Sequence, residues 1–415
     1  MTPLQHQGAA AKAAAHVLST AGTMKKNQAL EAIADILTQH QAEWLSANAE
    51  DVAAAREAGM APAMLDRLTL TPERISGIVD AVRQVAALPD PIGKVDKMET
   101  RPNGLIIGRR RVPLGVIAII FEARPNVTVD AAALCLKSGN ACILRGGREA
   151  IRSNRCAAAL MRQALVRAGL PEDCISLIQD TSHETANELM HLDGYVDVLI
   201  PRGGAGLIRA VAREASVPVI RTGEGVCHLY VDNEADLDMA ANILYNAKCS
   251  RPSVCNAVEC VLIHRDVEQA FLEKAVPLLD RHGVELRCDP ASLTMLGSRG
   301  TPAAESDWDA EYDDYILAVK TVESMEEAIA FINLHGTGHS EAILTANYFK
   351  AQTFLDQVDA AAVYVNASTR FTDGGEFGLG AEIGISTQKM HARGPMGLEE
   401  LTSCKYVIYG EGQVR

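Results

Sequence analysis

The spacing of hydrophobic residues changes along the chain, from helical periodicity at the start to short aliphatic runs later. Residues 9–88 carry apolar side chains three and four positions apart, as in residues 27–37, which is the spacing of amphipathic helices. Thr71 followed by Pro72 is typical of a helix start, since threonine caps the first turn and proline fits the first helical position. The pattern therefore predicts consecutive helices over this part.

Aliphatic runs and helical segments alternate from residue 105 to residue 220. Residues 116–121 are apolar throughout, which is typical of a parallel strand buried on both faces, and the weaker alternation of 105–112 indicates an edge strand. Pro218 favours an edge position or an irregular start for the last strand of the series. The alternation predicts a doubly wound, mostly parallel sheet. Its remaining elements are expected as strands at 141–144, 175–178, 196–200 and 217–220 and helices at 153–168, 184–191 and 204–214.

A second α/β unit is expected from residue 236 onward. Residues 404–409 form a lone β-prone segment with no hairpin partner nearby. A terminal strand of this kind needs a sheet edge to join, in its own subunit or in a neighbouring one. The other predicted elements of this unit are helices at 236–247, 266–280 and 324–333 and strands at 258–263 and 361–366.

Composition narrows the class of protein. The 415 residues are 48% hydrophobic and 22% charged, which is typical of a soluble globular protein with two domains. The net charge of −14 argues against a nucleic-acid-binding surface. Residues 1–7 carry no apolar signal core, and the run at 116–121 is too short to span a bilayer. The ten cysteines form no C-x-x-C pair. We expect a cytoplasmic protein with reduced thiols.

The histidines do not indicate a metal site. His335 and His339 stand four residues apart, but Gly336 and Gly338 between them disfavour a helical zinc pair. We therefore expect no metal.

Cys255 lies among small and polar residues with two cations nearby, Lys248 and Arg251. Positive charge favours the thiolate, which is the nucleophilic form of cysteine. The alternative is a buried structural cysteine, because free cysteine is among the most buried residue types. The local pattern leaves both interpretations open.

Two basic turns follow predicted strands. Arg202, Gly203 and Gly204 open a predicted helix, where backbone N–H groups can hold a phosphate; the alternative is a simple strand-to-helix turn. Arg145 and Arg148 could clamp a phosphate by charge-assisted hydrogen bonds, or could be ordinary surface charges.

Taken together, five segments resemble the aldehyde dehydrogenase superfamily, in the order that the family has them. The similarity covers essentially the whole chain and is closest to the branch that reduces L-glutamate 5-phosphate. The matching segments are residues 113–117, 121–128, 137–140, 253–257 and 391–398.

The resemblance implies a role for the thiol and its neighbours. Cys255 falls at the catalytic cysteine, and Asn126 at the asparagine that forms the oxyanion hole with the backbone N–H of that cysteine. Hydrolytic relatives carry a water-activating glutamate where Thr222 stands here, and Glu224, which is close by but displaced, is the weaker alternative for this base. Loss of this base fits an enzyme that exchanges phosphate, and not water, with its thioester. The cations considered for the leaving phosphate are Arg124, Lys248 and Arg251.

The resemblance also implies a nicotinamide cofactor. Arg145 and Arg148 fall on the turn that holds the adenosine ribose, where a second arginine would accommodate the 2′-phosphate of NADP. The other positions implied in cofactor binding are Arg202, Gly203 and Gly204 for the pyrophosphate and Glu311 for the nicotinamide ribose.

The implied activity is the NADPH-dependent reduction of L-glutamate 5-phosphate to L-glutamate 5-semialdehyde and phosphate through a cysteine thioester, the second step of proline biosynthesis from glutamate. The alternatives are another aldehyde dehydrogenase, hydrolytic or coenzyme A-acylating, and a catalytically silent nucleotide-binding protein on the same fold. The expected protein partner is a glutamate 5-kinase, which would channel the labile substrate.

The implied fold is aldehyde dehydrogenase-like α/β, with two doubly wound domains and a small β oligomerisation flap. We expect a cofactor domain at 1–230, a catalytic domain at 231–385 and a C-terminal return at 386–415. Residues 97–112 and the terminal strand at 401–411 would form the flap, which predicts a homo-oligomer, either a dimer or a tetramer.

Overall fold

Five helices precede the first strand of the chain. The structure is a computed structural model that describes residues 1–122 and 124–415. The Thr71 hydroxyl accepts a hydrogen bond from the Arg74 N–H, and Pro72 occupies the first turn of the following helix. The predicted run of helices and the predicted start at Thr71 are confirmed. The five are α1 (Pro3–Leu18), α2 (Thr23–Gln39), α3 (Gln41–Glu57), α4 (Pro62–Leu68) and α5 (Pro72–Ala87).

The described residues divide into two compact units. Unit 1 comprises residues 1–221, 378–384 and 396–415, and unit 2 comprises residues 222–377 and 385–395. The chain therefore builds most of unit 1, then unit 2, and returns two later segments to unit 1. The cofactor and catalytic roles expected of the two domains stay predictions.

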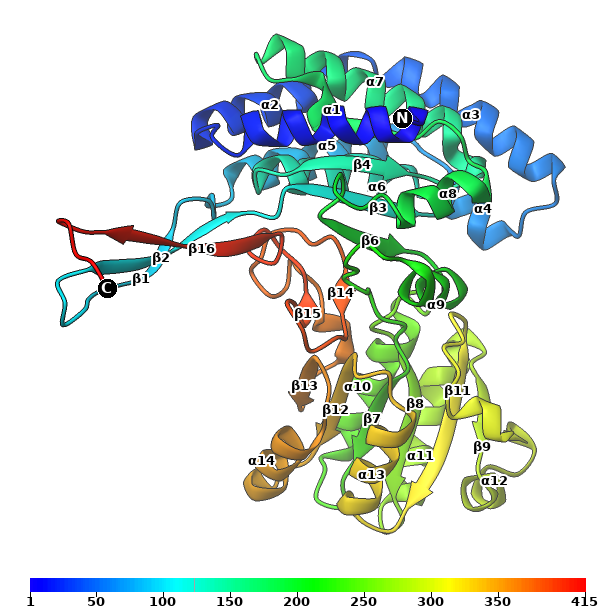
Figure 1. Ribbon diagram of the computed structural model, residues 1–415. Coiled ribbons are helices and arrows are strands. Elements are labelled where there is room, and N and C mark those ends of the chain that lie inside the picture. The colour runs from blue at the N-terminus through cyan, green and yellow to red at the C-terminus, as the bar shows by residue number, and fades with distance from the viewer. Residues whose placement is uncertain (123) are drawn as a thin grey trace. The chain divides into compact units, whose positions relative to one another are not determined.

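The main sheet of unit 1 has four parallel strands in the order β5-β4-β3-β6. From β3 the chain moves outward to β4 and β5, then crosses back to place β6 on the other side of β3 (Figure 1). This is the predicted doubly wound arrangement. The strands are β3 (Val116–Phe121), β4 (Ala141–Arg145), β5 (Ile175–Leu177) and β6 (Val198–Arg202), and the helices that follow them are α6 (Pro125–Lys137), α7 (Ile151–Arg167), α8 (His183–Met190) and α9 (Ala205–Glu214).

The prediction of a strand at 217–220 is wrong. This segment makes a single parallel bridge, between Leu199 and Val219. The Leu199 N–H donates to the Pro218 carbonyl at 2.8 Å, and the Ile220 N–H donates back to the Leu199 carbonyl at 3.0 Å. Because Pro218 has no N–H, the segment cannot extend this contact into a regular ladder.

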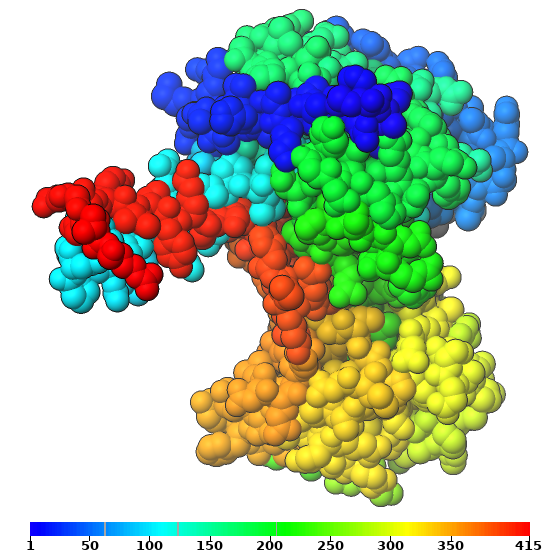
Figure 2. Space-filling model, in the orientation of Figure 1, coloured from blue at the N-terminus to red at the C-terminus, as the bar shows by residue number. Residues whose placement is uncertain are grey.

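The terminal strand has its partner within unit 1. Strand β16 (Thr402–Tyr409) pairs antiparallel with β2 (Ile106–Pro113) over its whole length, and β1 (Val95–Thr100) pairs with the other edge of β2. Figure 1 shows these three strands extending away from the helices of unit 1, and Figure 2 shows the same segments, cyan and red, packed against each other. The two segments that the sequence analysis assigned to one flap are therefore neighbours in one sheet.

A buried asparagine ties this sheet to the rest of unit 1. The Asn140 carboxamide accepts a hydrogen bond from the Gly115 N–H at 2.8 Å and donates to the Leu401 carbonyl at 2.8 Å. Gly115 has φ +128°, and a Cβ there would lie 2.1 Å from an Asp197 carboxylate oxygen, so only glycine fits. Asn140 thus holds together the residues that directly precede β3 and β16.

Unit 2 contains a seven-stranded parallel sheet in the order β10-β9-β11-β8-β7-β12-β13. The predicted helices and strands of this unit are all present. Strands β7, β9, β10, β11 and β12 were not predicted. The strands are β7 (Cys227–Val231), β8 (Val258–His264), β9 (Glu285–Cys288), β10 (Gly300–Pro302), β11 (Ile316–Val322), β12 (Ser340–Leu344) and β13 (Ala362–Val365). The helices are α10 (Leu237–Cys249), α11 (Glu268–Leu279), α12 (Pro290–Leu296), α13 (Met325–His335) and α14 (Tyr348–Gln357), and a short pair, β14 (Ile385–Ser386) and β15 (Gly394–Pro395), completes the unit.

Among the described residues, no helix is both long enough and apolar enough to cross a membrane.

Candidate active site

The strand order of unit 1 marks one edge of its sheet as a ligand site. The chain leaves β3 in one direction and returns on its other side with β6, so the switch point lies between these two strands. Open parallel sheets bind ligands beyond the carboxyl ends of their strands at such a point. The residues there are Glu122, which follows β3, and Arg202, which ends β6.

The turn after β6 can accept an anion. The Gly204 N–H, at the start of α9, donates to a Glu122 carboxylate oxygen at 3.0 Å, so a negative group already lies at this helix N-terminus. A Cβ on Gly203 would lie 2.5 Å from the same oxygen, which explains the glycine. In this structure the Glu122 carboxylate occupies that position, and the expected role of Arg202, Gly203 and Gly204 in binding a pyrophosphate stays a prediction.

The two arginines after β4 have different surroundings. The Arg145 guanidinium is half-buried and donates to the carbonyls of Thr181 at 2.8 Å and Ser182 at 3.2 Å. Burial lowers the pKa of Arg145, although nearby carboxylates, Glu149 first, act in the opposite direction. Arg148 is exposed at the start of a short 3-10 helix, Arg148–Ala150. Arg145 therefore fastens a loop, and Arg148 is the arginine open to a ligand.

Asn126 lies in the first turn of α6 and is held by the following turn. Its Nδ2 donates to an Asp130 carboxylate oxygen at 2.9 Å. Burial raises the pKa of Asp130 to about 6, while the hydrogen bond from Asn126 and the charge of Arg202 oppose this shift. Arg124 is exposed directly before α6. Ala123, inside one of the family segments, lies outside the described residues.

Cys255 lies in the loop between α10 and β8 of unit 2 and is half-buried. Its backbone carbonyl accepts a hydrogen bond from the Cys227 thiol at 3.2 Å. A Cβ on Gly225 would lie 1.5 Å from this carbonyl oxygen, so the segment 223–227 packs directly against the cysteine loop. The structure therefore brings the segment that carries Thr222 and Glu224 beside Cys255.

Glu311 belongs to the same neighbourhood. Its carboxylate accepts a hydrogen bond from the Gly225 N–H at 3.0 Å. Gly225 thus contacts both the Cys255 backbone and Glu311, two of the predicted site residues that lie far apart in the sequence.

Lys248 requires a correction. Its side chain is fully buried, and its Nζ lies 2.5 Å from Glu259, which is also buried. Burial raises the pKa of Glu259 to about 8, and the Lys248 charge opposes this shift. The ammonium group of Lys248 therefore stabilises Glu259 and does not reach a leaving phosphate. Arg251 is exposed in the cysteine loop and stays a candidate.

The structure adds a cation that was not predicted from the sequence. The Arg370 Nε donates to the Ser250 hydroxyl at 3.1 Å, and its Nη1 donates to the Asn256 side chain, next to Cys255. Arg370 is 114 residues from Asn256 in the sequence, so no local pattern could connect them.

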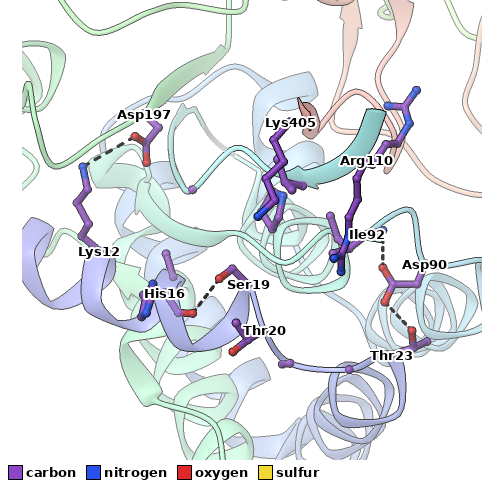
Figure 3. Close-up of a pocket in the computed structure, with 17 residues that line it drawn as sticks. Lys12, His16, Ser19, Thr20, Thr23, Asp90, Ile92, Arg110, Asp197 and Lys405 are labelled. Carbon is purple, nitrogen blue, oxygen red and sulfur yellow. Dashed lines mark hydrogen bonds and ion pairs between the residues drawn. The ribbon is translucent and has the colours of Figure 1, made fainter. Parts of the chain in front are cut away.

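A cavity of about 780 Å³ lies elsewhere in unit 1 (Figure 3). Lys12 and Asp197 form an ion pair of 3.9 Å across one part of it, and Arg110 and Lys405 enter from the flap strands. None of the predicted site residues lines it. We assign it no part in the chemistry.

Comparison with known proteins identifies the family. The model of the aldehyde dehydrogenase family matches residues 4–294 and 315–407. The chain belongs to this family. The family and the fold predicted from the sequence are confirmed.

Individual relatives are more specific. Gamma-glutamyl phosphate reductase of Halothermothrix orenii is 57% identical over 99% of this chain and 98% of its own length. The protein of the same name from Enterococcus faecalis is 55% identical over 100% of this chain and 99% of its own. The crystal structure of gamma-glutamyl phosphate reductase from Thermotoga maritima is 47% identical, covers 100% of both chains and has a TM-score of 0.97.

A more distant structure shows the fold alone. An acetylating aldehyde dehydrogenase from Geobacillus thermoglucosidasius is 18% identical, covers 99% of this chain and 97% of its own, and has a TM-score of 0.72. In the part of this chain that the structure describes, no group of three or more histidine, cysteine, aspartate or glutamate side chains is placed to hold a metal.

Replacing Asp130 by Leu should lower kcat about 10- to 100-fold, because Asn126 would lose the acceptor that orients its carboxamide. In the parent protein, protonation of Asp130 below its pKa of about 6 weakens the hydrogen bond from Asn126. The rate should therefore decline as the pH falls through 6, and this decline should be absent in Asp130→Asn, which keeps an acceptor oxygen. Steady-state pH profiles check this; a kcat near the parent value for Asp130→Leu would show that Asn126 needs no such support.

Proposed function

We propose that this chain reduces L-glutamate 5-phosphate to L-glutamate 5-semialdehyde and phosphate with NADPH as the reductant, the second step of proline biosynthesis from glutamate. The observation that carries this proposal is the identity of 55–57%, over the whole chain, to proteins named gamma-glutamyl phosphate reductase. An oxidoreductase that acts on aldehyde groups, as predicted, agrees with the family of the chain.

Cys255 acts as the nucleophile. Its thiolate attacks the acyl carbon of the substrate, and phosphate leaves to give a thioester. The Asn126 carboxamide and the Cys255 backbone N–H donate to the oxygen that becomes negative in the tetrahedral intermediate. After reduction, the thiohemiacetal on Cys255 collapses to free aldehyde and thiolate, and the enzyme is restored.

The residue at the position of the water-activating glutamate also fits this reaction. Thr222 is buried and carries a hydroxyl, which is too weak a base to activate water. The thioester on Cys255 therefore persists until it is reduced or meets phosphate. This feature separates the proposed enzyme from a hydrolytic aldehyde dehydrogenase on the same fold.

Members of this family use a nicotinamide cofactor, and we propose NADPH for this chain. When bound, NADPH supplies the hydride that reduces the thioester. The exposed guanidinium of Arg148 fits a dinucleotide with an extra phosphate. We assign the 2′-phosphate to Arg148, the pyrophosphate to the turn Arg202-Gly203-Gly204 and the nicotinamide ribose to Glu311, with Arg145 supporting the adenosine turn.

We propose that the protein works as a homo-oligomer joined through its three-stranded sheet. Strand β16 forms an edge of this sheet, and it exposes 70% of Tyr406 and 59% of Ile408. An open edge with apolar side chains favours pairing with another chain. Association with a glutamate 5-kinase and a cytoplasmic location stay predictions.

Replacing Cys255 by Ser should lower NADP⁺ reduction, with glutamate semialdehyde and phosphate as substrates, by at least about 1000-fold, because a serine hydroxyl lacks the nucleophilicity of a thiolate. Absorbance at the NADPH maximum measures this. Cys156→Ser, at a half-buried thiol on α7, is the matched control and should keep the parent rate. Near-parent turnover by Cys255→Ser would contradict the assignment.

The same assay separates the alternatives. With neither phosphate nor coenzyme A, the parent protein should not turn over. Sustained NADP⁺ reduction under that condition would favour a hydrolytic enzyme, and restoration by coenzyme A in place of phosphate would favour an acylating one.

Replacing Arg148 by Glu should raise the KM for NADPH about tenfold or more and leave the KM for NADH nearly unchanged, because only NADPH carries the phosphate that the guanidinium would bind. Binding titrations by NADPH fluorescence give the same comparison without turnover. Arg167→Glu, the same charge reversal at an exposed position at the end of α7, is the control. Equal losses for both cofactors would contradict the assignment of the 2′-phosphate.

The parent protein should have at least the mass of a dimer in light scattering at micromolar concentration. Replacing both Tyr406 and Ile408 by Glu should give a smaller species, because charge on the sheet face opposes pairing. Tyr348→Glu, at an equally exposed aromatic on α14 (68%), should leave the mass unchanged. A monomeric parent protein would exclude the proposed role of this sheet.

A further inference from the structure

We propose that Arg370 binds the phosphate group of the substrate, as the leaving group in reduction and as the attacking group in the reverse reaction. This assignment rests on the proposed function and names a residue of the site that the sequence did not reveal. It replaces Lys248, which is buried and lies 2.5 Å from the Glu259 side chain.

The Arg370 side chain is hydrogen-bonded to the cysteine loop. It lies in the short 3-10 helix Thr369–Phe371, which follows β13. Its Nε donates to the Ser250 hydroxyl at 3.1 Å and its Nη1 donates to the Asn256 side chain. Ser250 and Asn256 lie on either side of Cys255 in the same loop, so the guanidinium contacts the loop that carries the nucleophile at two points.

The backbone around Arg370 is fixed to that loop as well. The Asn256 Nδ2 donates to the carbonyls of Arg370 at 3.2 Å and Thr372 at 2.9 Å. The Thr369 hydroxyl donates in turn to the Asn256 carbonyl at 2.7 Å. Two segments more than a hundred residues apart are thus held together by reciprocal hydrogen bonds, which positions the guanidinium before any substrate binds.

The charge of Arg370 is available to a substrate anion. Its side-chain partners, Ser250 and Asn256, are neutral, and among the described residues it forms no ion pair, in contrast to Lys248. Burial lowers the pKa of Arg370 and the charge of Arg251 acts the same way, while Cys255 and the carboxylate of Asp373 act in the opposite direction. Arg370 is half-buried, and a half-buried guanidinium binds anions more strongly than one in water.

Phosphate is favoured over the α-carboxylate of the substrate. In an acyl phosphate the phosphorus is two bonds from the carbon that the thiolate attacks, whereas the α-carboxylate carbon is four bonds away. A guanidinium bound to the residue next to Cys255 is placed for the nearer group. The phosphate is also a dianion, and Arg370 with Arg251 provides two positive charges.

The step in which Arg370 acts involves no oxidation or reduction. In the reverse direction, an oxygen of hydrogen phosphate forms a bond to the thioester carbon, the bond from that carbon to the Cys255 sulfur breaks, and the electron pair returns to sulfur as thiolate. The proton of hydrogen phosphate leaves to solvent, and the acyl phosphate is released. Arg370 offsets negative charge on the phosphate oxygens in both directions.

The reverse reaction separates the two half-reactions and so tests the role of Arg370. Semialdehyde and NADP⁺ without phosphate should give a burst of about one NADPH per active site and an acyl-enzyme detectable by intact-protein mass. Addition of phosphate should then start turnover. Arg370→Gln should keep the burst and the acyl-enzyme but raise the KM for phosphate about 100-fold. Arg370→Lys, which keeps the charge but not the fork of donors, should raise it about tenfold.

Arg265→Gln is the matched control, since Arg265 forms an exposed ion pair with Glu323 in the same unit. It should change neither the burst nor the KM for phosphate. An unchanged KM for phosphate in Arg370→Gln would overturn the proposal. A slower burst that requires more semialdehyde would also overturn it, because Arg370 would then bind the α-carboxylate. Equal losses in both half-reactions would overturn it as well, because Arg370 would then serve to hold Asn256. If Arg370→Gln does not fold, the same criteria apply to Arg370→Lys.

The proposed function and the role of Arg370 are contradicted by different results. If the parent protein turns over without phosphate, the proposed function fails whatever the variants do. If the parent protein requires phosphate and Arg370→Gln responds to phosphate as the parent does, only the assignment of Arg370 fails.

Discussion

Burial of parallel strands on both faces is the constraint on which the sites of this protein depend. Strands β3 and β8 have no exposed residue, so the polar chemistry can lie only beyond strand ends. Unit 1 uses the carboxyl ends, where Glu122 and the Arg202 turn meet at the switch between β3 and β6. This is the usual choice for an open α/β sheet.

Unit 2 uses the opposite edge of its sheet. Cys255 comes just before β8, Gly225 just before β7 and Glu311 before β11, so all three lie at the amino ends of parallel strands. The carboxyl edge is closed by a buried network: Asp232 accepts hydrogen bonds from Lys350 at 3.0 Å and from Thr345 at 2.7 Å. Because these polar groups satisfy one another, that edge stabilises the unit and leaves the amino edge for the proposed reaction.

The sequence predicted the elements whose pattern is complete within one segment. The early helices, the apolar strand β3 and the basic turns after β4 and β6 are of this kind. Strands β7 and β12 were not predicted, and each carries a polar residue whose partner lies on the other strand. His228 of β7 and Glu341 of β12 are neighbours in the sheet, almost fully buried, and bonded to each other at 3.1 Å, so their polarity cancels only as a pair. Arg370 was not predicted either, since the contacts that suggest its role are with a loop far away in the sequence.

The pairing of β16 with β2 also sets an order on the assembly of unit 1. Strand β2 ends at Pro113, but its partner begins at Thr402, after all of the main part of unit 2. On the ribosome, one edge of β2 therefore stays open while almost three hundred further residues are made. An unpaired edge of this length can template pairing with other chains. Strand β2 carries three consecutive arginines, residues 109–111. During synthesis, their like charges disfavour pairing between this open strand and the same strand of a second nascent chain.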